Sequence, residues 1–166
     1  MTTLKIQPVE YSGNGLDVLC RAIIGRFYPL IQDFDVFDNL TLNTLLKNHP
    51  RLKGRNIKSE DQIALDSNTF LSYLAISNGY GYILGVTSLP VRDWWFDAIW
   101  SPLTLKFDPR KHKTIDGQAG NEDNYGVAFV STYRNSNRLF QGDSLEGLIT
   151  TAVHEIGHIF GLIHHN

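Results

Sequence analysis

Three histidines, a glutamate and a glycine close to the end of the sequence have the types and spacing of a metal site. His154 and His158 are four residues apart, which on a helix places both rings on one side with their bases about 6 Å apart. Gly161 can end that helix in a left-handed conformation. The chain can then turn back and present His164 as a third nitrogen ligand. The spacing therefore predicts one zinc ion bound by His154, His158 and His164.

Glu155 follows the first histidine directly and is predicted to be a general base. Three neutral imidazoles leave zinc its full positive charge and one open coordination position, where the pKa of water falls to about 7. Glu155 can take the proton from that water and pass it to a leaving amine, while the metal polarises the carbonyl. This chemistry predicts hydrolysis of a peptide bond. Two alternatives stay open: a zinc-holding or peptide-binding module without useful turnover, and hydrolysis of a small amide.

The segment that carries these residues is predicted to be an amphipathic helix. Asp143 and Glu146 fit a capping box at its start. Seven apolar residues fall on one face at about 100° per residue: Leu145, Leu148, Ile149, Ala152, Val153, Ile156 and Phe160. His154 and His158 lie on the opposite side, so they are predicted to face a cleft or solvent. The alternative without a metal is a helix with solvent-facing histidines and a glycine stop.

The rest of the chain supplies the elements that must position this helix. Apolar and β-branched runs predict strands at residues 3–9, within 34–42, at 82–87 and at 126–133. Helical spacing predicts helices at 16–28 and from 59–61 to about Gly79. Residues 116–126, rich in Gly, Asn and Asp, predict a loop, with a calcium loop as the alternative. The order predicts one α/β domain over residues 1–166: a mixed twisted sheet packed against helices, with the zinc-binding helix last.

One aromatic cluster leaves two interpretations open. Trp94, Trp95 and Trp100 lie within eight residues of sequence, between Asp93 and Trp100. Such residues pack in cores, and they also line substrate clefts. The basic stretch at residues 50–58 is typical of a solvated loop.

Composition limits the classes of function. The 166 residues carry a net charge of −2, with 42% hydrophobic and 19% charged residues. These values are typical of an ordinary globular protein and give no electrostatic case for nucleic acid or an anionic membrane. Cys20 is the only cysteine, which excludes an internal disulfide or a cysteine-rich zinc site. Without a signal-like start or a membrane-length apolar run, we expect a cytoplasmic protein acting on peptide or protein substrates.

The pattern HExxHxxGxxH over residues 154–164 resembles the signature of the metzincin clan of zinc endopeptidases, and the chain looks most like the archaemetzincins. Residues 84–87 followed by Asp93, and residues 126–131 with Arg134, are similar to strands of that family. The resemblance implies a zincin-like domain, with its sheet above a horizontal cleft and its lowest strand antiparallel to bound substrate. By position, residues 126–132 would be that strand and would bind peptide by strand addition.

Two departures from the family pattern stand out. Met1 is the only methionine, so the methionine turn beneath the metal cannot exist as such. Archaemetzincins also continue past the third histidine with cysteines for a second zinc ion, whereas here only His165 and Asn166 follow His164. The expectation is a natural minimal form or a chain that lacks the C-terminal part. His165 is an alternative third ligand, although the spacing favours His164.

Overall fold

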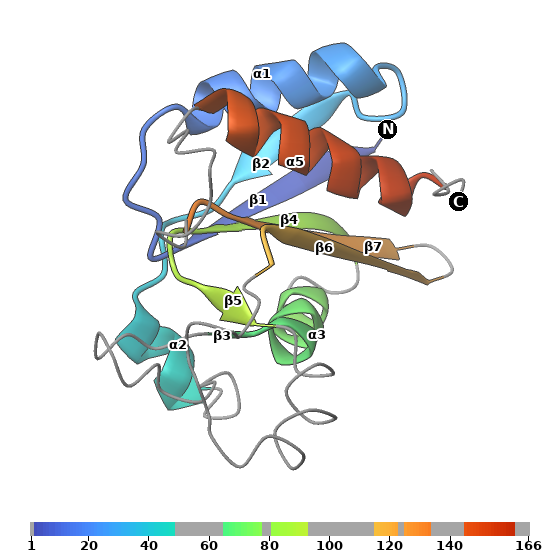
Figure 1. The fold of residues 1–166 in the computed structure, drawn as a ribbon. Helices are drawn as coiled ribbons and strands as arrows, with labels where there is room; N and C mark the ends of the chain where they lie inside the picture. Colours follow the sequence, from blue (N-terminus) through green and yellow to red (C-terminus); the bar gives the residue numbers. More distant parts are fainter. Residues whose placement is uncertain are drawn as a thin grey trace, which may run out of the picture.

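The computed structural model describes residues 2–48, 65–77, 81–92, 115–122, 125–133 and 145–161. At its centre lies a five-stranded sheet in the order β2-β1-β4-β7-β6 (Figure 1). Its strands are β1 (Thr3–Val9), β2 (Asp33–Val36), β4 (Tyr82–Thr87), β6 (Gly117–Glu122) and β7 (Tyr125–Ser131). β2, β1, β4 and β7 are parallel, and only β6 runs antiparallel to its neighbour. The fold class is therefore α/β with a mostly parallel sheet.

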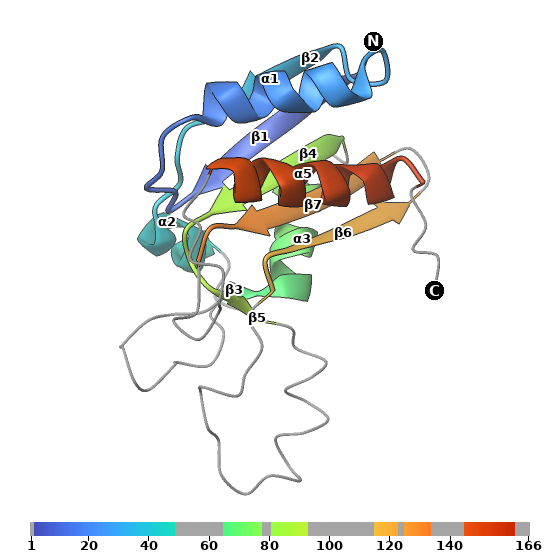
Figure 2. The ribbon, with the colours of Figure 1, turned by 45° about the horizontal axis from the view of Figure 1, so that its top comes forward.

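Helices cover both faces of this sheet. The described helices are α1 (Leu16–Phe27), α2 (Leu42–Asn48), α3 (Ser67–Ser77) and α5 (Leu145–Ile159). α1 and α5 lie side by side on one face and α3 lies on the other, as both views show (Figures 1 and 2). A short sheet pairs β3 (Leu65–Asp66) with β5 (Val91–Arg92). Parallel strands with both faces covered must be apolar throughout, and β4 is buried from Ile83 to Thr87.

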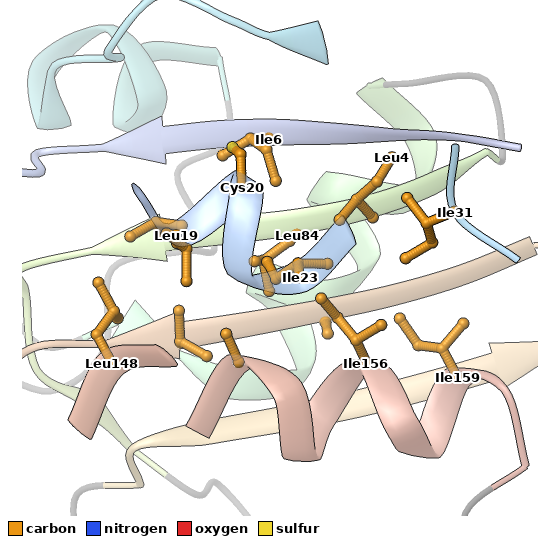
Figure 3. Close-up of a cluster of buried hydrophobic side chains, with 14 of the residues drawn as sticks. Leu4, Ile6, Leu19, Cys20, Ile23, Ile31, Leu84, Leu148, Ile156 and Ile159 are labelled. Carbon is orange, nitrogen blue, oxygen red and sulfur yellow. The ribbon is translucent and has the colours of Figure 1, made fainter. Parts of the chain in front are cut away.

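Strand alternation divides the core into two apolar clusters. In β4, Leu84 and Val86 point to the side of α1 and α5, while Ile83 points to the side of α3. Figure 3 shows the first cluster, in which Leu19 and Ile23 of α1 and Leu148 and Ile156 of α5 meet the sheet. This cluster fixes α5, and with it the histidines, over the β7 and β6 side of the sheet.

A glycine lets α5 approach the sheet closely. A side chain at Gly126 of β7 would overlap the Cγ2 atom of Ile159, so the helix could not keep its present distance from the strand. The backbone of Gly126 does not have a positive φ, which means that space and not conformation requires glycine here.

Several predicted elements are confirmed. The strands at residues 3–9 and 82–87 are β1 and β4. The helix predicted at 16–28 is α1, which ends one residue earlier. The last helix is α5, whose described part begins at Leu145.

Three predictions are wrong. Residues 117–122 form β6 and not a loop. Backbone hydrogen bonds with β7 stabilise this strand, and the types of its side chains do not predict them. Residues 126–131 do not form an edge strand, because β7 is paired with β4 on one side and β6 on the other. The helix expected from 59–61 to about Gly79 does not run through residues 65 and 66, which pair with β5; its described part is α3 from Ser67, and residues 59–61 lie outside the described ranges. The short elements α2 and β5 were not predicted.

Some predictions concern residues outside the described ranges: the basic stretch at 50–58, the tryptophan cluster at 93–100 and the capping residue Asp143. In the part of the chain that the structure describes, no helix is both long and apolar enough to cross a membrane.

Candidate metal centre

The two faces of α5 are as different as the sequence predicts. Ala152 and Ile156 are fully buried against the sheet, whereas His154 is exposed and His158 half-buried. The prediction that these histidines do not belong to the core is confirmed. The helix also ends as expected, because Gly161 has a φ of 97° and donates its N–H to the carbonyl of His158 at 3.1 Å.

The two imidazoles converge on one point. The Nε2 atoms of His154 and His158 are 3.0 Å apart, and the ring centroids are 4.6 Å apart with an angle of 89° between the planes. A tetrahedral zinc ion with Zn–N bonds of about 2.0–2.1 Å holds two ligand nitrogens about 3.3 Å apart. A change of a few tenths of an ångström in the Nε2 separation would therefore admit the ion, and the pair fits zinc as two of its ligands.

Glu155 lies on the flank of α5 between the histidines and the sheet. The residue is 9% exposed, and it is the only charged residue among the buried residues that the structure describes. The carboxylate is packed against Gly117 at the start of β6, beside Thr151 of the same helix. A carboxylate buried next to two histidines can accept a proton in a place that excludes most of the solvent.

The strand beside this carboxylate is the last strand of the sheet among the described residues. There β6 pairs with β7 alone, and the N–H of Ser131 donates to the carbonyl of Asp116 at 2.7 Å. In an antiparallel ladder, bonded pairs alternate with pairs that turn their backbone groups outward. Residues 118, 120 and 122 therefore pair with β7, whereas Gly117, Ala119 and Asn121 direct their N–H and C=O groups to the side away from β7.

Sequence reasoning missed this strand as part of the site. The segment GQAGNE has no β-branched or aromatic residue, so its composition is typical of a loop. The one available signal was its position, since a chain segment directly before a buried strand often returns along it as a hairpin.

An aromatic cluster fixes the end of α5 where the chain leaves for the third histidine. Phe160 stacks on Tyr82 of β4, with ring centroids 5.4 Å apart and 20° between the planes. Phe27 at the end of α1 packs on the ring of Phe160, with the two ring centroids 6.0 Å apart. These contacts fix the end of α5 at Phe160 by packing. His158 lies two residues before Phe160 on the same helix.

His164 and His165 lie outside the described residues, so the third ligand stays a prediction. Among the residues that are described, no three His, Cys, Asp or Glu side chains form a group that could hold a metal ion. Cys20 is buried in the cluster between α1 and the sheet, and burial raises the pKa of its thiol to about 11. It is therefore neither a metal ligand nor a ready nucleophile.

Comparisons with protein-family models, curated proteins and solved structures find no match to this chain. The case for a metallopeptidase site rests on the residues and geometry of the chain itself.

Proposed function

We propose that this chain is a zinc-dependent metallopeptidase of metzincin type, on a zincin-like α/β domain, with one zinc ion held by His154, His158 and His164. The observation that carries the proposal is the convergence of two imidazole Nε2 atoms at 3.0 Å, beside a buried carboxylate and an open strand edge. A helix with histidines that merely face solvent does not need this combination.

The ligand atoms follow from the geometry. In the metal-free structure the two Nε2 atoms are within hydrogen-bond distance of each other, so one ring can donate its Nε2–H to the other. To hold zinc, both Nε2 atoms would present a lone pair, and the proton of each ring would reside on Nδ1. His164 is the third ligand by its spacing from Gly161, where the chain turns. Zinc in a site of three imidazoles acidifies water and polarises a peptide carbonyl.

Glu155 acts as the general base. Its carboxylate takes the proton that the attacking water gives up and returns it to the nitrogen of the departing amine. Its burial against β6 restricts the side chain to a few positions, on the flank of α5 next to the face that carries the histidine pair. A positioned general base contributes about 10²–10⁴-fold to the rate.

The peptide substrate pairs with β6. Of residues 126–132, which the family likeness pointed to, those in β7 are paired with β4 on one side and β6 on the other, so they cannot accept a further strand. β6 is next to α5 and directs the backbone groups of Gly117, Ala119 and Asn121 to the open side. An extended peptide can add there through main-chain hydrogen bonds.

Zinc analysis and cleavage of a peptide library test the proposal. We expect one zinc per chain and cleavage that Glu155→Gln lowers about 10²–10⁴-fold without loss of metal. The matched control is Glu146→Gln, because Glu146 lies in the exposed first turn of the same helix and should have no effect. Full zinc occupancy without cleavage of any library member would instead favour the zinc- or peptide-binding module, and no bound zinc would exclude the metallopeptidase and the zinc-holding module.

A further inference from the structure

The contact between Glu155 and Gly117 joins the helix that carries the histidines to the open edge of the sheet. A Cβ atom built on Gly117 would lie 2.8 Å from Cγ of Glu155 and 3.1 Å from its Oε1. Carbon atoms do not approach to 2.8 Å without a shift of one partner. The side chain of Glu155 thus occupies the space that any other residue at position 117 would take.

Glu155 has little room to move aside within the protein. The same Cβ would lie 3.0 Å from Cγ2 of Thr151, whose hydroxyl donates to the carbonyl of Gly147 at 2.9 Å and so fixes its rotamer. Ala152, Ile156 and Ile159 are buried around the glutamate on the helix. A larger residue at position 117 must therefore displace the carboxylate from its place against β6.

Backbone conformation does not require glycine at this position. Gly117 does not have a positive φ, unlike Gly15 and Gly161, and it lies inside a regular strand. Glycine in a strand interior costs conformational entropy relative to alanine. The absence of a side chain at position 117 leaves the space that the side chain of Glu155 occupies.

We propose that Gly117 is a positioning residue for the general base: its missing side chain creates the seat in which the carboxylate of Glu155 is held against the edge strand. This inference rests on the proposed peptidase function for its catalytic meaning, whereas the seat itself is a packing feature that can be tested without metal or substrate.

Gly120 provides a matched control in the same strand. Its neighbour in the register is Val127, which belongs to the cluster on the side of α3, so position 120 faces away from α5. A Cβ there would have its nearest neighbour at 4.0 Å, which is ordinary contact. Its backbone groups pair with β7 and do not face the open side. Gly120→Ala adds the same methyl group to the same strand without touching Glu155.

The first experiment is a double-mutant cycle of thermal unfolding in the metal-free protein. Gly117→Ala should lower the midpoint temperature by about 3–10 °C because of overpacking. In a Glu155→Ala background the loss should be clearly smaller, since the contacts with Cγ and Oε1 are gone and only the contact with Cγ2 of Thr151 remains. Gly120→Ala should leave the midpoint within about 2 °C in either background. An equal loss from Gly117→Ala in both backgrounds would overturn the seat.

Should Gly117→Ala alone fail to fold, a double variant with Glu155→Ala that folds normally would establish the same coupling, and a double variant that also fails would overturn it. These outcomes do not depend on any activity. A parent protein that binds no zinc would contradict the proposed function and leave the cycle able to decide the seat.

The second experiment separates positioning from general packing. In the zinc-loaded protein, Gly117→Ala should lower kcat at least 10-fold, by more than it raises KM, and should keep the zinc content of the parent, because the substitution displaces the carboxylate and keeps the backbone N–H and C=O groups. Gly120→Ala should have the kcat, the KM and the zinc content of the parent. A Gly117→Ala protein with the kcat of the parent would overturn the positioning role, even where the unfolding cycle shows the contact.

Discussion

Among the described residues the sheet ends at β2 on one side and at β6 on the other, and these two strands differ in direction and in charge. β2 at one end has exposed carboxylates, Asp33 and Asp35, and runs parallel to its neighbour. β6 at the other end runs antiparallel and has no charged residue from position 117 to 121. Charged side chains on an edge strand discourage pairing with other chains. β2 is protected in this way, whereas β6 is not.

The surroundings of the two edges explain the difference. α5 packs on β6 and β7 and brings Glu155 and the histidine pair to that end of the sheet. No titratable pair of this kind lies beside β2 in the described ranges. An uncharged edge strand can pair with other chains. We propose that β6 uses this property to bind a peptide beside Glu155 and the histidine pair. β2 then serves as an internal control for every prediction about β6.

The largest expected effect concerns the metal. His158→Ala should reduce bound zinc from one ion per chain to none that survives gel filtration, because the remaining ligands no longer surround the ion. The counterpart is the double substitution Asp33→Asn and Asp35→Asn at β2, which should retain the full zinc content. Atomic absorption on both proteins would decide it. Loss of zinc from the double β2 variant, with full zinc content in His158→Ala, would place the metal at the β2 edge and contradict the prediction.

A smaller effect is expected from the backbone of β6. Ala119→Pro removes an N–H that faces the open side, so it should raise KM about 2–10-fold, the value of one hydrogen bond of about 0.5–1.5 kcal/mol. The unfolding midpoint should change little. Gln118→Pro removes an N–H that pairs with β7 and should lower stability instead. Peptide kinetics and thermal unfolding of the pair measure both. A KM for Ala119→Pro equal to that of the parent would exclude strand addition at β6.

The smallest effect is expected at β2 itself. Asp33→Asn and Asp35→Asn are exposed changes away from the site, so the free energy of unfolding should change by less than about 0.5 kcal/mol. Peptide cleavage should equal that of the parent. Urea unfolding and the same kinetic assay measure the two quantities. A fall in cleavage would mean that substrate reaches the β2 edge, against the assignment of β6.

The sequence by itself determined which residues face the core and which could do chemistry. Periodicity works for α5 because one continuous helix presents Ala152 and Ile156 to the sheet and must turn His154 and His158 the other way. The left-handed turn at Gly161 was equally predictable, because glycine adopts a positive φ at no steric cost. These features are local, and local features can be deduced from the order of residues.

Only the tertiary structure decided where the edge of the sheet lies and what touches Glu155. The segment 117–122 is a strand because the backbone of β7 offers it partners, and no side chain of GQAGNE records that pairing. Once β6 is added, β7 becomes an interior strand and Gly117 meets Glu155, which lies 38 positions further along the sequence. Hydrogen bonds between strands and the absence of a side chain at one contact depend on partners distant in sequence, so neither could be deduced from spacing or composition.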